Sequence, residues 1–112
     1  MLFAGLPVAD FPAASAWYER VFGRPADVVA HDEEVLWQVT TGGWLYIVRD
    51  PARAGTGSAA MAVPDLEVAL AELAARDVTA GPVEPQGSAG RKAVARDPDG
   101  NALALIEVNG PS

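Results

Sequence analysis

The sequence contains a long-period internal repeat. Residues 3–11 read FAGLPVADF and residues 58–66 read SAAMAVPDL, at an offset of 55 residues, and each segment is a short apolar run that ends at an Asp. A second match, at an offset of 58 residues, aligns GGWLYI at 42–47 with GNALAL at 100–105. Such a repeat indicates that one supersecondary unit is used twice, which limits the possible folds more than any other feature of this sequence.

The expected order of elements is βαβββ, present twice. Asp10 and Asp65 are suited to cap the two helices, and Gly23 is suited to end the first. Strands are expected at residues 2–9, 28–30, 35–40, 44–49, 58–63, 78–84, 92–96 and 102–107. The sequence therefore predicts one α+β domain over residues 1–112, with a first module at about 1–50, a linker at about 50–57 and a second module at about 58–112.

Composition excludes several classes of function. The absence of cysteine excludes disulfides, zinc–thiolate sites and thiol catalysis. No run is long and apolar enough for a membrane span or an export signal, so we expect no membrane contact and a cytoplasmic location. A net charge of −7 argues against nucleic acid as a partner and leaves cationic partners open.

Four segments resemble one protein family. They are LPVAD at 6–10, WYERVFG at 17–23, AVPDL at 62–66, and the turn DPDGN at 97–101 with the apolar run that follows it. With the doubled βαβββ order, these segments resemble the vicinal oxygen chelate superfamily, which includes glyoxalase I, extradiol dioxygenases, fosfomycin-resistance enzymes and bleomycin-resistance proteins. The resemblance covers nearly the whole chain. It implies that the two modules form an open, curved mixed sheet with helices on the outer face.

The resemblance also indicates where a metal would be held. In metal-dependent members, four side chains on the inner face of the sheet bind the ion, and they are typically His, Gln or Glu. The resemblance places these positions at Phe3, Tyr46, Ser58 and Ala104. Phenylalanine and alanine have no lone pair to offer, and a neutral hydroxyl is a poor ligand for Zn²⁺, Ni²⁺ or Fe²⁺. We therefore expect no metal and no cofactor.

Two other polar groups are candidates for chemical sites. The run HDEE at 31–34 holds every suitable metal ligand type, but neighbouring strand residues alternate between faces, so a solvated hairpin is expected. Asp97 and Asp99 are compatible with an acid–base pair. Their position in a Pro/Gly turn favours hydrogen bonds to the backbone instead.

Aromatic residues indicate a recognition surface. Alternation places Trp44 and Tyr46 on one face of their strand, and the resemblance assigns that face, with Phe3, to the cleft. Ala102 and Ala104 opposite would leave room for a flat, apolar or cationic small molecule.

Two further residues complete the candidate set. Trp37 shares a face with Val35 and Val39, which favours the core, although a place in the pocket stays open. Arg91 ends a Gly-rich loop and is a candidate contact for an anionic ligand group. The expected ligand-binding residues are Phe3, Trp37, Trp44, Tyr46, Ser58, Arg91 and Ala104.

Three functions remain open. The preferred one is a metal-free binding protein, similar to the bleomycin-resistance branch, that sequesters a small molecule and catalyses no reaction. The second is an enzyme that uses Tyr46, Glu34 or Glu107 as acid or base. The third is a structural or regulatory dimer. A homodimer is expected in every case, on fold analogy.

Overall fold

The structure is a computed structural model, and it describes residues 1–108. The last residues of the second module, 109–112, lie outside this range. The elements in chain order are β1 (Leu2–Val8), α1 (Phe11–Phe22), β2 (Val28–His31), β3 (Glu34–Thr40), β4 (Gly43–Arg49), β5 (Ser58–Ala62), α2 (Leu66–Ala75), β6 (Glu84–Pro85), a 3₁₀ turn (Gly87–Ala89), β7 (Gly90–Arg96) and β8 (Ala102–Val108). Within residues 1–108, no helix has the length and apolarity needed to cross a membrane.

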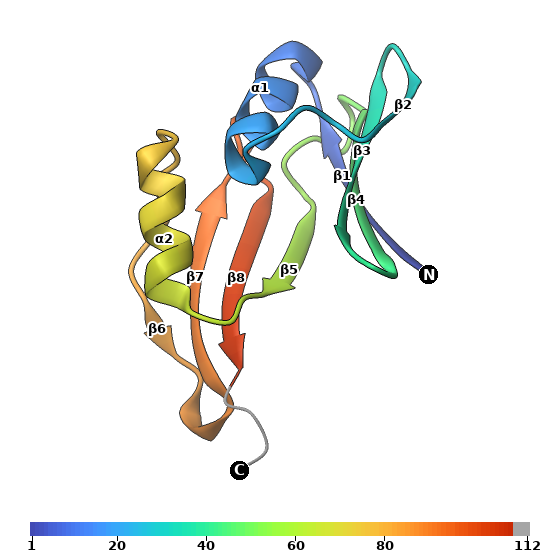
Figure 1. The fold of residues 1–112 in the computed structure, drawn as a ribbon. Helices are drawn as coiled ribbons and strands as arrows, with labels where there is room; N and C mark the ends of the chain where they lie inside the picture. The colour runs from blue at the N-terminus through green and yellow to red at the C-terminus, as the bar shows by residue number, and fades with distance from the viewer. Residues whose placement is uncertain (109–112) are drawn as a thin grey trace.

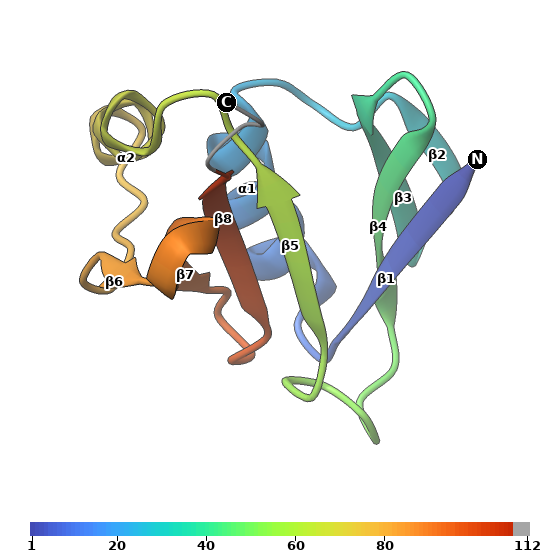
Figure 2. The same cartoon turned by 90° about the horizontal axis from the view of Figure 1, so that it is seen from below.

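The strands form two four-stranded mixed sheets. Sheet A has the order β1-β4-β3-β2 and sheet B has the order β5-β8-β7-β6 (Figures 1 and 2). In each sheet the first strand of the module lies parallel to the last, whereas the other pairs are antiparallel. The two modules therefore have the same topology, which confirms the α+β class and the doubled βαβββ unit.

The helix boundaries follow from local side-chain chemistry. The Asp10 carboxylate accepts a hydrogen bond of 3.1 Å from the backbone N–H of Ala13, and Asp65 accepts one of 3.1 Å from Val68. These bonds satisfy N–H groups that a helix start otherwise leaves free. Gly23 ends α1 in the left-handed region at φ 71°, where glycine pays no steric cost. The expected caps are confirmed.

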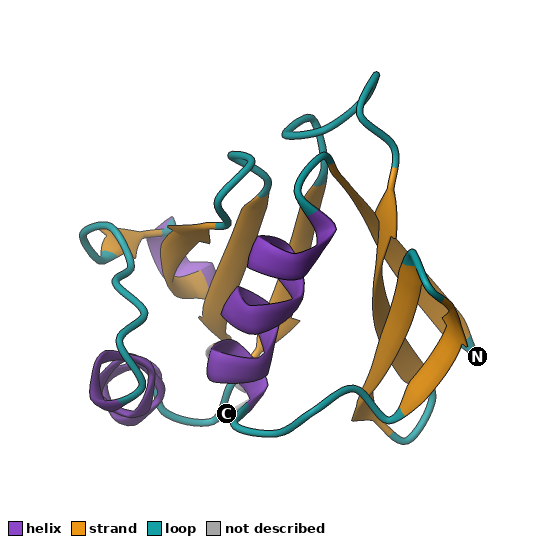
Figure 3. Ribbon diagram, turned by 90° about the horizontal axis from the view of Figure 1, so that it is seen from above, coloured by secondary structure: helices purple, strands orange, loops and turns teal. Residues whose placement is uncertain are grey.

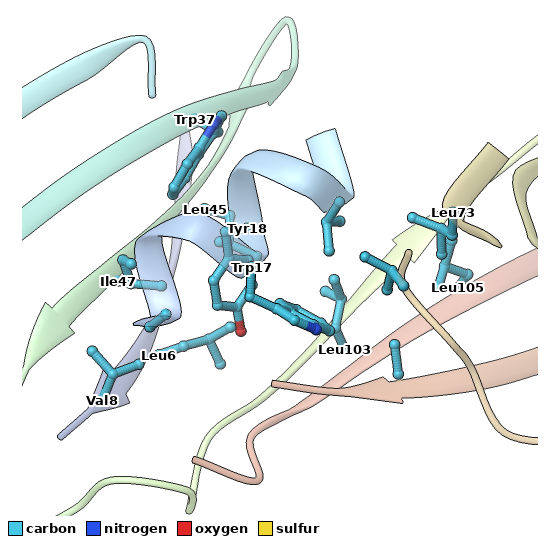
Figure 4. Close-up of a cluster of buried hydrophobic side chains, with 14 of the residues drawn as sticks. Leu6, Val8, Trp17, Tyr18, Trp37, Leu45, Ile47, Leu73, Leu103 and Leu105 are labelled. Carbon is cyan, nitrogen blue, oxygen red and sulfur yellow. The ribbon is translucent and has the colours of Figure 1, made fainter. Parts of the chain in front are cut away.

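Helix α1 lies between the two sheets (Figure 3). On one side its Tyr18 ring is 6.0 Å, centroid to centroid, from that of Trp37 in sheet A. On the other side Trp17 and Leu103 of sheet B belong to the same buried cluster (Figure 4). Helix α2 packs against β7 and β8 of sheet B. The buried side chains of both modules consequently form one hydrophobic cluster.

The strand expected at residues 78–84 is wrong for most of its length. Only Glu84 and Pro85 pair with β7, and the segment before them is irregular. Val78 is 1% exposed and packs into the core, so its apolar character reflects burial and not pairing. Pro82 has no N–H to contribute to a ladder, and Gly81 donates to Val94 O at 2.8 Å. The strand therefore does not extend through residues 78–83.

Candidate functional site

Each sheet buries one face and leaves the other without a helix. In sheet A, strand register pairs Phe3 with Trp44 and Gly5 with Tyr46. Directly paired residues share a face. Their neighbours in the chain, such as Leu45 and Ile47, are buried against α1, so the paired set lies on the side of sheet A that faces away from α1.

The aromatic residues of this face form what we call the aromatic platform, made of Phe3, Trp44 and Tyr46. The rings of Phe3 and Trp44 are stacked, with centroids 6.4 Å apart and planes at 27°. Tyr46 lies so close to β1 that a Cβ at Gly5 would overlap its ring. Phe3 is 51% exposed, and the other two rings are partly exposed. The platform thus offers aromatic surface to solvent, which suits stacking against a flat molecule.

The uncovered face of sheet B has a different composition. Register pairs Ser58 with Ala102, and Ala60 with Ala104. We call this row of small residues the alanine shelf, made of Ser58, Ala60, Ala62, Ala102 and Ala104. Its side chains are partly or fully exposed, and the shelf leaves room beside it because none of them extends far from the backbone.

The platform and the shelf do not face each other within one chain. The core faces of both sheets turn toward α1, so the two uncovered faces turn away from it and from one another (Figures 2 and 3). The structure therefore brings Phe3, Trp44 and Tyr46 together, and brings Ser58 and Ala104 together, as two separate sets. The small residues expected opposite the aromatics are on the other sheet.

Trp37 lies on the opposite face of sheet A from the platform. Its side chain is 0% exposed, and its ring packs against those of Tyr18 and Phe22, at centroid distances of 6.0 and 5.4 Å. Its indole Nε1 donates a hydrogen bond of 3.1 Å to Arg24 O. Trp37 therefore lies in the core, as strand alternation favoured, and has no contact with the uncovered face.

Arg91 is held by carboxylates on the helix-covered face of sheet B. Its guanidinium donates to Glu107 at 3.2 Å and to Glu67 at 3.3 Å. Hydrogen bonds to Glu67, and then to Glu107, raise the pKa of Arg91. Glu107 in turn accepts from the backbone N–H of Leu66 at 2.9 Å. The side chains of Arg91 and Glu107 therefore hold the start of α2 against sheet B. Neither side chain lies with the platform or the shelf.

Asp97 is the centre of a buried polar network. Its Oδ1 accepts from the backbone N–H groups of Asp99 and Asn101, at 3.0 and 2.9 Å, as its turn position predicts. Its Oδ2 also accepts from the Tyr18 hydroxyl at 2.9 Å and from Asn101 Nδ2 at 2.8 Å. No sequence pattern indicated the Tyr18 contact, which is long-range. The network holds the turn that precedes β8 against α1, so its role is structural.

The residues at the family's metal positions do not fit a divalent cation. Phe3 and Tyr46 lie on sheet A, whereas Ser58 and Ala104 lie on sheet B. Their only donor atoms are two neutral hydroxyls, which are poor ligands for transition metals. Among residues 1–108, no three His, Asp or Glu side chains gather to hold an ion. His31 lies in a hairpin instead, with Nε2 at 3.6 Å from Glu34 Oε1.

An apolar cavity of about 220 Å³ adjoins the platform, between β1 and β5. Trp44 contributes to its lining, with Leu2, Ala4, Val39, Thr40, Gly43, Leu45 and residues 59–62. The Trp44 Nε1 atom is buried and has no hydrogen-bond partner among residues 1–108. A buried N–H without a hydrogen-bond partner costs free energy.

Comparison with known proteins places this geometry in context. The sequence matches the Glyoxalase/Bleomycin resistance protein/Dioxygenase superfamily over residues 2–105. A comparison with curated protein sequences gave no match.

Solved structures extend the comparison. A glyoxalase/bleomycin resistance protein from Catenulispora acidiphila DSM 44928 is 39% identical, with a TM-score of 0.90, and the match covers 96% of this chain and 97% of that one. A bleomycin resistance determinant encoded on the transposon Tn5 is 23% identical, with a TM-score of 0.79 and 98% of each chain covered. A bleomycin-binding protein from Streptomyces verticillus, complexed with copper(II)-bleomycin, is 23% identical, with a TM-score of 0.76 and coverage of 96% and 95%.

The two structures below 25% identity share the fold. The family match spans nearly the whole chain, and the Catenulispora protein agrees with it in sequence as well as in structure. The chain therefore belongs to the glyoxalase/bleomycin resistance protein/dioxygenase superfamily.

Proposed function

We propose that this chain is a metal-independent binding protein that sequesters a flat aromatic small molecule and acts as a homodimer. The observation that carries the proposal is the aromatic platform, because three aromatic side chains lie on a sheet face that this chain leaves without a helix. Aromatic rings bind flat ligands by stacking and by burial of apolar area, without any metal. The residues at the family's metal positions offer few atoms that could bind a metal ion, which supports ligand binding over catalysis.

A second copy of the chain would supply the missing wall of the site. Leu2 is 72% exposed and Phe3 51% exposed, so one end of β1 presents apolar side chains to solvent. Both β1 and β5 are edge strands in residues 1–108, and an uncharged edge strand is a ready surface for pairing. If β1 of one copy pairs with β5 of the other, the platform of one copy meets the alanine shelf of its partner.

The relatives are compatible with this proposal. Similar folds include a bleomycin-binding protein complexed with bleomycin, at 22% identity, and an antibiotic-binding protein from Streptomyces sp. CB03234, at 22% identity. Both names describe capture of a small molecule. At this identity they support the class of function and leave the ligand open.

The direct test is isothermal titration of chelator-treated protein. The ligands are bleomycin, with and without copper, and a panel of flat aromatic compounds of different charge. We expect one or more to bind at one site per platform with an affinity that EDTA does not change. Trp44→Leu should weaken that binding about tenfold, because one stacking surface is lost. The matched control is Val83→Ala, an exposed apolar residue outside the platform and the shelf.

The dimer is tested by analytical ultracentrifugation at the same concentrations. We expect a dimer for the unaltered protein and a monomer for Phe3→Asp, which places a charge on the exposed end of β1. A protein that binds ligand as a monomer would contradict the proposed second wall. Binding that disappears with EDTA would contradict metal independence.

A further inference from the structure

The uncovered face of sheet B carries a cation that forms no ion pair among residues 1–108. Strand register pairs Lys92 with Ile106, and Val94 with Ala104, so Lys92 lies on the same face as the alanine shelf. Lys92 is half-buried. Among residues 1–108, its ammonium makes no ion pair within 4.0 Å and no hydrogen bond.

Two other cations that lie on the sheets are paired with carboxylates. Arg49 has the Glu33 carboxylate at 4.0 Å, and Arg91 is held by two carboxylates. The chain carries 15 Asp and Glu residues against eight Lys and Arg, so a potential partner for Lys92 is not scarce. The nearest candidate by register is Glu84 on β6, whose side chain is exposed and forms no such pair.

A second cation lies further along the same face. Arg96 pairs in register with Ala102, and its guanidinium is in contact with a backbone carbonyl, Gly100 O, at 3.2 Å. Lys92 lies two residues before Val94 and Arg96 two residues after it. At the usual rise per strand residue, the two cations are separated by about 13 Å along β7. The alanine shelf on β8 is one strand away, about 5 Å across the sheet. A ligand seated on the shelf would therefore lie within reach of a lysine side chain.

We propose that Lys92 binds an anionic group of the ligand, so that the natural ligand is an aromatic acid. This inference rests on the proposed function, because it assumes a flat ligand between the platform of one copy and the shelf of another. The aromatic part would stack on the platform, and a carboxylate or sulfonate would accept a hydrogen bond from Lys92. Charge complementarity decides between ligands here, since the partly buried ammonium is favoured by an anion and opposed by a cation.

The proposal revises the expectation of a cationic ligand. That expectation follows from the net charge of −7, which describes the whole surface, and from cation–π attraction to the aromatic residues. The local field at a site depends on the charges nearest to it, because ions beyond about 8–10 Å are screened at physiological salt. On the face of sheet B that carries the shelf, the charged residues of β7 are Lys92, opposite Ile106, and Arg96, opposite Ala102, and both are cations.

Three ligands of one shape test the inference: 2-naphthoate, 2-naphthamide and 2-(aminomethyl)naphthalene, which are anionic, neutral and cationic near pH 7. Affinities are measured by isothermal titration on the full chain at low salt. We expect naphthoate to bind most tightly and the cation least. Lys92→Gln should weaken naphthoate about 3- to 10-fold and leave naphthamide unchanged, whereas Lys92→Arg should retain the preference.

Two matched variants separate a local contact from overall charge. Arg53→Gln makes the same change in net charge on the linker, and it should leave all three affinities unchanged. Glu84→Gln removes the one carboxylate opposite Lys92, and it should strengthen naphthoate binding about twofold. Raising the salt concentration should reduce the naphthoate preference of the unaltered protein.

The outcomes distinguish this inference from the proposed function. Equal binding of all three compounds, with no effect of Lys92→Gln, would overturn the role of Lys92 and leave aromatic binding in place. Tighter binding of the cation would overturn it in the same way. Failure of all three compounds to bind, together with every aromatic compound of the wider panel, would overturn both proposals.

Discussion

The Tyr18 hydroxyl donates a hydrogen bond of 2.9 Å to Asp97 Oδ2, across 79 residues of sequence. This bond joins α1 of the first module to the turn that precedes β8 of the second. Both side chains are buried, and Asp97 is otherwise satisfied within its own turn. The two modules are therefore held together by polar chemistry as well as by their common hydrophobic core.

Tyr18→Phe should destabilise the protein. The change keeps the ring but removes one donor from a buried carboxylate, which should lower the free energy of unfolding by about 1–3 kcal/mol. Urea denaturation measures the loss. Tyr46→Phe is the control, because the Tyr46 hydroxyl has no hydrogen-bond partner among residues 1–108, and its cost should be near zero. Equal effects of the two variants would show that the Tyr18 bond contributes nothing.

Stability should fall in alkaline solution because of Tyr18. Burial raises the pKa of Tyr18 well above its ordinary value, and the Asp97 carboxylate raises it further. An unfolded tyrosine loses its proton near pH 10, whereas the folded protein keeps this proton to higher pH. Stability is then complete below about pH 10 and falls above it, by up to about 1.4 kcal/mol per pH unit. Urea midpoints from pH 9 to 11 should fall more steeply for the unaltered protein than for Tyr18→Phe.

Gly5→Ala should disturb the aromatic platform. The new methyl group would overlap the Tyr46 ring, and the strain should cost about 1–3 kcal/mol of stability and weaken ligand binding. In the double variant Gly5→Ala, Tyr46→Ala, most of that strain should be absent, which a double-mutant cycle measures as a coupling energy. Gly42→Ala is the control, since within residues 1–108 no atom outside its two chain neighbours lies within 4 Å of its added Cβ. Strictly additive costs would contradict the close approach.

Arg91→Gln should change stability and not recognition. The Arg91 side chain is 37% exposed, so loss of its ion pairs should cost less than about 1 kcal/mol in a thermal or urea melt. Ligand affinity should stay within about twofold, because the guanidinium is on the helix-covered face. A loss of naphthoate affinity as large as that of Lys92→Gln would show that Arg91 contacts the ligand, as the sequence alone led us to expect.

Divalent metals should not stabilise the protein. Thermal-shift titrations with Zn²⁺, Ni²⁺, Fe²⁺ and Mn²⁺ are expected to give no saturable rise in Tm, because the family's metal positions hold donor-poor side chains. Untagged protein is required. A rise that His31→Ala removes would come from the hairpin, whereas a rise that persists in this variant would contradict the prediction.

The sequence determined the local features of this protein. Helix caps at Asp10 and Asp65 depend on side chains that bond to backbone groups three residues away, so their residue types predict them. Strand alternation likewise placed Trp44 and Tyr46 on one face, because successive side chains point to opposite sides. The repeat then implied that both modules share one topology. The strand prediction at 78–84 was wrong because Val78 is apolar for burial in the core, which a local pattern does not distinguish from strand pairing.

Only the tertiary structure decided how the modules meet. Nothing local requires α1 to lie between the two sheets, yet that packing buries one common core and turns the platform and the shelf away from each other. The same packing set the partners of Tyr18 and Arg91, which come from distant parts of the chain. Such contacts arise from the burial of apolar surface summed over the whole domain, and a sequence read in short segments does not contain that sum.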